Sequence, residues 1–269
     1  MKAKRKKRPK KGNKRGIYVL PNLFTSASLF GGFYAVIGAI QGRYESAAIA
    51  ILVACLFDGL DGKIARYTHT TSLFGAEFDS LSDLVAFGVA PGILAFEWAL
   101  EPFGRLGWFA CFMYVICGAL RLARFNVQRN SVQDGYFRGL PIPAAASFIA
   151  SLVLFMSYLG GLPGARHILI LVFIYLLSFL MVSTLEYPSF KELESKKQKP
   201  FNVLVTAILI LTVIAYKPRI TLFLVLLVYT GLGPVATVRR RRKKFEAARG
   251  SKKPGPLRPE SEARREMVR

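Results

Sequence analysis

Long apolar segments recur along this chain of 269 residues and constrain its fold more than any other feature. Most are roughly 20 residues long, the length that an α-helix needs to cross the hydrocarbon of a bilayer, and the segment at 201–216 is shorter. The formal net charge is +22, but the basic residues gather between and beyond the apolar segments. This separation is typical of a polytopic membrane protein. We predict an all-α fold with membrane spans at approximately residues 20–41, 46–66, 79–100, 106–126, 141–160, 167–186, 201–216 and 219–238.

The positions of the Lys and Arg residues predict the orientation of these spans. With both termini in the cytoplasm, the basic residues left on the other side, out of 38, are Arg43, Arg105, Arg166, Lys217 and Arg219. Because positive charge favours the cytoplasmic side, we expect a multi-pass protein of the cell (inner) membrane. The basic run at residues 1–8 could indicate nucleic acid binding. Beside a first span, contact with anionic membrane lipids is the preferred interpretation, and no nucleic acid partner is expected.

Four aspartates stand at the cytoplasmic ends of the second and third predicted spans: Asp58, Asp61, Asp79 and Asp83. Carboxylates are costly near hydrocarbon, so they mark a functional site by default. The first pair is spaced i, i+3 and the second i, i+4, so each pair shares one helix face. A polar connection at residues 67–74 lets the antiparallel helix ends meet, which predicts a cytoplasmic site. Two divalent ions would cancel the four charges, and oxygen-only ligands favour Mg²⁺, Mn²⁺ or Ca²⁺ over zinc.

Small residues accompany the carboxylates. Gly62 and Ala65 fall on the face of Asp58 and Asp61, which leaves room for a phosphorylated ligand against the backbone. Arg66 supplies a cation for a phosphate, and Gly75 permits a close approach or an unusual dihedral before the next helix. Two alternatives stay open, since glycines also mediate helix packing and aspartates can line an ion pathway or cap helices.

The stretch from Asp58 to Asp83 resembles the signature of the CDP-alcohol phosphatidyltransferases, D-x-x-D-G-x-x-A-R-x8-G-x-x-x-D-x-x-x-D, at every specified position. The resemblance implies that Asp58, Asp61 and Asp79 are metal ligands. It implies that Asp83 is the general base and also touches metal. It further implies that Gly62, Ala65 and Arg66 line the site for the CDP group.

Other segments resemble the membrane-embedded phosphatidylserine synthases of that family, over roughly residues 17–190. The segments are 20–25, 78–91, 121–126 and 139–146. This resemblance implies a homodimer with a six-helix core at 17–186 and two additional helices at 187–238. The implied reaction transfers the phosphatidyl group of CDP-diacylglycerol to L-serine, giving phosphatidylserine and CMP. Alternatives are another acceptor (glycerol 3-phosphate, an inositol phosphate or choline) and, from a different class, a divalent-cation transporter.

Further polar residues lie at the same membrane depth. Arg121 and Arg124, spaced i, i+3 at the end of the fourth span, could hold the carboxylate of serine. The alternative is that both arginines extend to lipid headgroups. Asn22 and Thr25, a turn apart on the first span, could hydrogen-bond the nucleotide or cap a helix.

The remaining segments carry less information. Residues 1–16 and 239–269 form basic cytoplasmic tails, and the second is predicted to be disordered because its composition cannot bury a core. Cys55, Cys111 and Cys117 fall in apolar segments without disulfide or zinc spacing. His69 and His167 have no partner motif, although His69 lies close enough to the aspartates to touch a bound phosphate.

Overall fold

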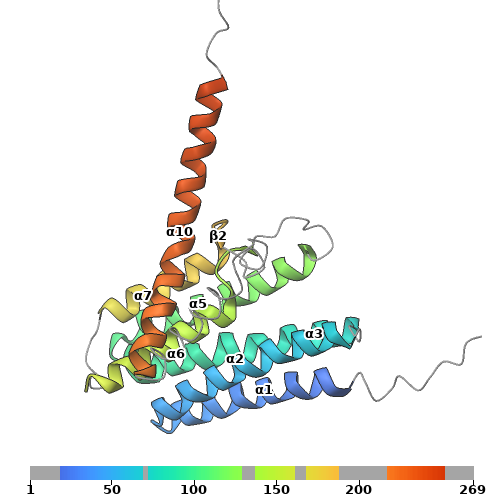
Figure 1. Ribbon diagram of the computed structural model, residues 1–269. Coiled ribbons are helices and arrows are strands. Elements are labelled where there is room, and N and C mark those ends of the chain that lie inside the picture. Colours follow the sequence, from blue (N-terminus) through green and yellow to red (C-terminus); the bar gives the residue numbers. More distant parts are fainter. Residues whose placement is uncertain (1–18, 69–71, 129–136, 161–167, 188–216, 252–269) are drawn as a thin grey trace, which may run out of the picture.

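The computed structural model describes residues 19–68, 72–128, 137–160, 168–187 and 217–251. Figure 1 shows these residues as a bundle of helices, which confirms the predicted all-α class. The helical elements are α1 (Val19–Ile40), α2 (Tyr44–Tyr67), α3 (Leu73–Asp83), η2 (Leu84–Val89), α4 (Ala90–Ala95), η3 (Phe96–Leu100), η4 (Glu101–Phe103), α5 (Arg105–Gln128), α6 (Ile142–Tyr158), α7 (Ile168–Val182) and α10 (Pro218–Ser251). Two short strands, β1 (Phe137–Arg138) and β2 (Glu186–Tyr187), pair antiparallel.

Several helices have the composition of membrane spans. Among the described residues, the stretches long and apolar enough to cross a bilayer are Leu20–Ile40, Leu73–Phe103 and Arg105–Val127. Shorter apolar helices are Ile142–Tyr158, Ile168–Val182 and Pro218–Pro234. With the apolar pattern of the sequence, these helices make the chain a membrane protein. The predicted span at 201–216 lies outside the described residues.

Helices α1 and α2 lie side by side and approach closely through small residues (Figure 1). Ala35, Ala39 and Ala54 are fully buried. A Cβ atom added to Gly31 would lie 3.1 Å from the Cβ of Ala54, so the two backbones leave little room for a larger side chain. Small residues commonly allow such close packing between helices in lipid. The packing fixes α2, which carries the first pair of aspartates, against α1.

The stretch from α3 to η4 contains two π-helical segments, η2 and η3. Pro91 explains the first, because its ring nitrogen has no hydrogen to donate to the carbonyl of Phe87, four residues earlier. The amide of Ala90 donates to the carbonyl of Val85, five residues back. The buried hydroxyl of Tyr114 on α5 donates to the carbonyl of Phe87 over 3.0 Å. An unsatisfied buried carbonyl would cost about 1–3 kcal/mol, so Tyr114 stabilises the irregular turn that directly follows Asp83.

The predicted start of the third span is wrong. We expected a connection at residues 67–74 and a helix from residue 79, but α3 begins at Leu73. The hydroxyl of Ser72 accepts a hydrogen bond of 2.9 Å from the amide of Gly75, so Ser72 caps the helix. Serine is typical both of polar connections and of helix N-caps, and here it is a cap. Asp79 consequently lies in the second turn of a helix.

The predicted disorder of the C-terminal tail is wrong for residues 239–251. Helix α10 continues without a break to Ser251, and Figure 1 shows its end projecting away from the bundle. Arg, Lys, Glu and Ala all favour helix formation, and extending an existing helix avoids the cost of nucleation. Residues 1–16 and 252–269 of the predicted tails lie outside the described part of the chain.

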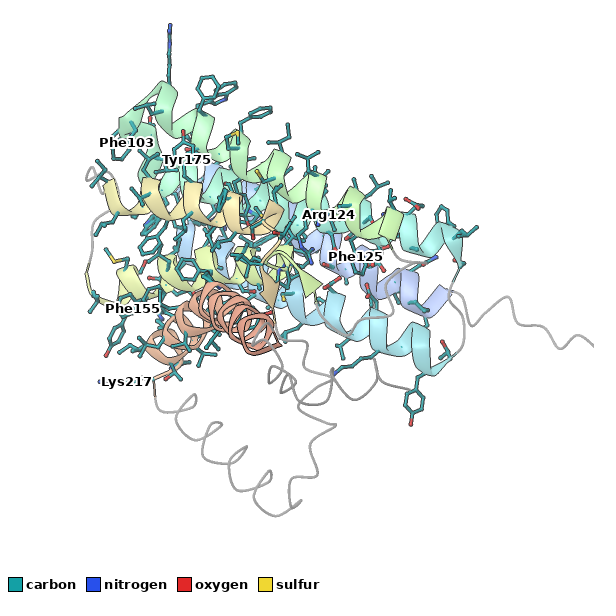
Figure 2. The ribbon with its side chains drawn as sticks, turned by 90° about the horizontal axis from the view of Figure 1, so that it is seen from above. Phe103, Arg124, Phe125, Phe155, Tyr175 and Lys217 are labelled. Carbon is teal, nitrogen blue, oxygen red and sulfur yellow. The ribbon has the colours of Figure 1, made fainter. Side chains whose placement is uncertain are left out.

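The two ends of the bundle carry different residues. Figure 2 shows Phe103, Tyr175 and Lys217 toward one end, with Arg124 and Phe125 further toward the other. Near the first end, an ion pair of 2.9 Å between Arg219 and Glu45 joins the beginnings of α10 and α2. These two helices therefore begin at the same end of the bundle, although Figure 1 shows α10 crossing α2 at a steep angle.

Candidate functional site

Carboxylates from two helices meet at one place. One oxygen each of Asp58 and Asp61 on α2 and of Asp79 on α3 lie within 4.8 Å of one another. The carboxyl group of Asp83, one turn after Asp79, shares a side-chain hydrogen bond with that of Asp58. The structure therefore brings together all four aspartates that the sequence singles out.

This cluster has the chemistry of a site for a hard divalent cation. Its donors are carboxylate oxygens, the ligands that Mg²⁺, Mn²⁺ and Ca²⁺ prefer. Carboxyl groups this close repel one another when ionised, and either a shared proton or a bound cation relieves the repulsion. Because oxygens from two helices converge, a cation here could be bound by both. The residues present therefore fit a divalent metal.

Thr25 on α1 connects the two helices that carry the aspartates. Thr25 is only 3% exposed, and its hydroxyl donates a hydrogen bond of 2.8 Å to Oδ2 of Asp61. Its backbone carbonyl accepts a hydrogen bond of 3.1 Å from the hydroxyl of Ser82 on α3. The structure shows that the hydroxyl of Thr25 orients a carboxylate, whereas the expected contact of Thr25 with a nucleotide stays a prediction.

A strip of open surface adjoins the carboxylates. A Cβ atom added to Gly62 or Gly59 would meet no other atom within 4 Å, so α2 presents bare backbone there. This is the unobstructed face that the sequence predicts for Gly62. Ala65 and Arg66 continue the same helix, but their side chains lie outside the described part of the structure.

Gly75 lies in the first turn of α3, facing α1. A Cβ atom on Gly75 would lie 3.4 Å from Oδ1 of Asn22 and 3.1 Å from the hydroxyl oxygen of Ser72. The predicted close approach is therefore present. The alternative of an unusual dihedral is wrong, since the described glycines with positive φ are at residues 42, 104, 139 and 160.

The two arginines of the fourth span have different surroundings. Nη1 of Arg124 donates to the carbonyl of Val182 over 3.4 Å, at the last residue of α7. Cationic side chains often satisfy carbonyls at helix C-termini, so this contact has a structural role. Arg121 is mostly buried within electrostatic range of Asp83, and its buried Nε has no hydrogen-bond partner among the described residues. Arg121 is therefore the better placed of the two to receive an anionic ligand.

Two serines that support the site, Ser80 and Ser82, were not recognised individually from the sequence. Ser82 binds the carbonyl of Thr25, and Nδ2 of Asn126 on α5 donates to the hydroxyl of Ser80 over 2.9 Å. Both serines lie between Asp79 and Asp83 on α3. Their position between the aspartates was the available signal, because a serine there has a short side chain that can bond a neighbouring helix.

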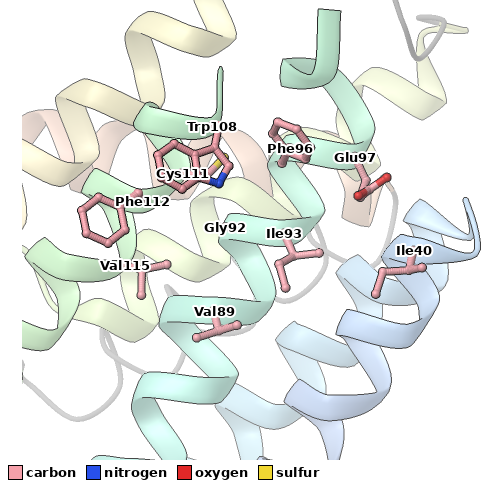
Figure 3. A pocket seen from close by; sticks show the side chains of 10 residues that line it. All are labelled: Ile40, Val89, Gly92, Ile93, Phe96, Glu97, Trp108, Cys111, Phe112 and Val115. Carbon is pink, nitrogen blue, oxygen red and sulfur yellow. The ribbon is translucent and has the colours of Figure 1, made fainter. Parts of the chain in front are cut away.

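A cavity of about 320 Å³ lies elsewhere in the bundle, and Figure 3 shows the side chains that line it. Ile40, Phe96 and Trp108 are among its mostly apolar lining residues, and Glu97 is its acidic one. Ile40 is the last residue of α1, whereas Thr25 lies near the beginning of that helix. The cavity is therefore separate from the aspartate cluster. The cysteines are also uninvolved in disulfides, since Cys55, Cys111 and Cys117 are all free.

Comparison with known proteins identifies the family. The family model of the CDP-alcohol phosphatidyltransferases matches residues 18–185, a range that contains all four aspartates. The chain belongs to the CDP-alcohol phosphatidyltransferase family. It is therefore an enzyme of a family that depends on divalent metal, and the aspartate cluster offers suitable ligands. Helix α10 lies beyond the matched residues.

Curated relatives extend this result. A CDP-diacylglycerol–serine O-phosphatidyltransferase from Helicobacter pylori is 44% identical over 178 residues, covering 66% of this chain and 75% of the relative. An archaetidylserine synthase from Methanothermobacter thermautotrophicus is 40% identical, covering 63% of this chain and 69% of the relative. A CDP-diacylglycerol–serine O-phosphatidyltransferase from Bacillus subtilis is 34% identical over 173 residues, covering 64% of this chain and 92% of the relative.

Proposed function

We propose that the protein transfers the phosphatidyl group of CDP-diacylglycerol to the hydroxyl group of L-serine, giving phosphatidylserine and CMP. The observation that carries this proposal is the convergence of Asp58, Asp61, Asp79 and Asp83 beside the open strip at Gly62. Serine is the acceptor common to the names of the relatives, although the lipid differs between them. We therefore assign serine to this chain as well.

The aspartates are the proposed metal ligands. Asp58, Asp61 and Asp79, together with Asp83, would hold Mg²⁺ or Mn²⁺, and Ca²⁺ also suits the ligand set. Two ions would match the charge of the four carboxylates. When bound, the metal supplies charge neutralisation for the reacting phosphoryl group and for CMP as leaving group.

Asp83 is the proposed general base. It accepts the proton of the serine hydroxyl while the serine oxygen forms a bond to the lipid-bearing phosphorus. The bond between that phosphorus and the CMP oxygen breaks, and CMP leaves with its electron pair. Arg121 lies within electrostatic range of Asp83, so its guanidinium can hold the serine carboxylate beside the base.

The open strip on α2 is the proposed site for the CDP group. Gly62 leaves the backbone of α2 accessible, and Asn22 lies beside Gly75 at the start of α3. Ala65 and Arg66 are assigned to the same site from the family resemblance. Gly62→Leu should raise the KM for CDP-diacylglycerol by more than about tenfold, because the side chain fills the space that the nucleotide needs. Steady-state kinetics and nucleotide binding measure the effect. Gly231→Leu is the control, since a Cβ atom there also meets nothing within 4 Å. An unchanged KM would show that the strip is not the nucleotide site.

The proposal also covers the orientation of the protein in the membrane and its oligomeric state. The charge pattern supports an active site and both termini in the cytoplasm, where serine and CDP are available. The six-helix core at 17–186 is supported by the family match, with additional helices at 187–238. A homodimer is proposed from the family resemblance, and chemical crosslinking in membranes tests it.

An acceptor panel tests the function. Purified protein with Mg²⁺ or Mn²⁺ and CDP-diacylglycerol should release CMP when L-serine is added, and mass spectrometry should identify phosphatidylserine. Glycerol 3-phosphate, an inositol phosphate and choline should give little product. A better rate with one of these acceptors would replace serine in the proposal. No CMP release with any acceptor, together with metal flux into liposomes, would indicate a transporter.

A further inference from the structure

Helix α10 packs one face against the bundle. The ring of Phe223 stacks on Phe155 with centroids 4.6 Å apart, and it lies 5.7 Å from the ring of Phe148. Leu226 and Tyr229 also pack against the buried core. Residues spaced by three along a helix lie near one another on its surface, so the face that anchors α10 also directs Tyr229 into the protein.

Tyr229 is directed toward the charged part of the site. It lies within electrostatic range of Arg121, which in turn lies within range of Asp83. Arg121 belongs to α5 inside the family core, whereas Tyr229 belongs to a helix outside it. The C-terminal helix therefore brings Tyr229 close to Arg121, the residue that lies between it and Asp83.

The chemistry of a tyrosine suits this position. Arg121 has a buried Nε without a hydrogen-bond partner in the described part of the chain, so this guanidinium has donor capacity to spare. A phenol can accept a hydrogen bond from a guanidinium and restrict its orientation without cancelling its charge. A carboxylate in the same place would cancel the charge and compete with an anionic ligand.

We propose that Tyr229 is a positioning residue for the acceptor: it holds the guanidinium of Arg121 beside Asp83, with one edge available to the carboxylate of serine. This inference rests on the function proposed above and extends the site beyond the family core. It assigns to α10 a role in acceptor affinity, because a carboxylate binds best to a guanidinium whose orientation is already fixed.

The role should concern binding more than the chemical step. The relative from Bacillus subtilis has 92% of its length matched by 173 residues, about as many as the family core contains. Little of that relative is left for a counterpart of α10, although its name describes transfer to serine. The reaction itself therefore does not require this helix, and we expect Tyr229 to adjust how tightly this chain binds its acceptor.

Tyr229→Phe tests the proposal in the full-length protein. At saturating CDP-diacylglycerol, the KM for L-serine should rise about five- to tenfold, with kcat within about twofold of the original value. The KM for CDP-diacylglycerol should stay unchanged. Tyr175→Phe is the matched control, because the hydroxyl of Tyr175 bonds the carbonyl of Leu106 on the surface, away from the aspartates. It should leave both KM values unchanged.

A double-mutant cycle separates positioning from packing. If Tyr229 acts through Arg121, then Tyr229→Phe should have no further effect on the serine KM in an Arg121→Ala background. Additive effects would overturn the proposal, as would an unchanged serine KM in the single variant. A fall in kcat at constant KM would also overturn it. In each of these cases the original protein still makes phosphatidylserine, so the proposed function stands. No reaction of the original protein with serine would overturn the proposed function instead.

Discussion

Asp83→Asn should lower turnover with serine by roughly 10²–10⁴-fold, the usual contribution of a general base. Asparagine keeps the shape of the side chain but cannot accept the proton of the serine hydroxyl. Binding of CDP-diacylglycerol should persist, because Asp58, Asp61 and Asp79 still offer converging oxygens. The rate of CMP release in a single turnover measures the chemical step. A separate measurement of CDP-diacylglycerol binding shows whether the metal site is still intact.

Glu97→Gln is the matched control for this variant. Glu97 lies in the same helical stretch as Asp83 but lines the separate cavity, so the same chemical change should leave turnover nearly unchanged. Similar rates for Asp83→Asn and the original protein would remove Asp83 from the role of base. Loss of lipid binding together with turnover would show instead that Asp83 acts mainly as a ligand.

Asp61→Asn should abolish detectable activity through loss of metal. The carboxylate of Asp61 is one of three that converge, and the hydroxyl of Thr25 fixes its orientation. Removing only that orienting bond, with Thr25→Val, should weaken metal affinity by about 10–100-fold. Removing the charge itself should weaken the affinity further. Titration with Mn²⁺, followed by electron paramagnetic resonance, measures both variants without requiring activity.

Glu45→Gln is the control on the same helix. Glu45 forms an exposed ion pair with Arg219 at the far end of α2, and such pairs contribute only about 0–1 kcal/mol. Its Mn²⁺ affinity should equal that of the original protein. Normal Mn²⁺ binding by Asp61→Asn would contradict the proposed ligand set.

The sequence predicts the helices and the meeting of the aspartates because both depend on local patterns. An apolar segment of sufficient length crosses the bilayer, and carboxylates spaced i, i+3 or i, i+4 share a face wherever the helix lies. The rotation of α1 about its axis is different, since it depends on close packing with α2. For this reason the sequence alone could not predict the hydrogen bond from Thr25 to Asp61.

The features that were missed depend on contacts between distant segments. The π-helical turn after Asp83 follows from Pro91 and is stabilised by Tyr114, which lies on another helix. The position of Tyr229 requires α10 to fold back over the core. Neither the contact of Tyr114 nor the packing of α10 leaves a periodic pattern of residues in the sequence. The start of α3 at Leu73 was missed for a simpler reason, because a serine before a helix resembles one in a connection.

The length of the helical stretch from Leu73 to Phe103 places the chemistry at a particular depth. It contains 31 residues, more than the roughly 20 that hydrocarbon requires. At a rise of 1.5 Å per residue, Asp83 lies about 30 Å from Phe103, which equals the hydrocarbon thickness. With Phe103 at one edge of the hydrocarbon and the stretch along the bilayer normal, Asp79 would lie in the headgroup layer, level with the phosphorus atoms of the surrounding phospholipids. A lipid substrate could react without being lifted out of its leaflet, and only the water-soluble reactants would have to enter and leave from the solvent.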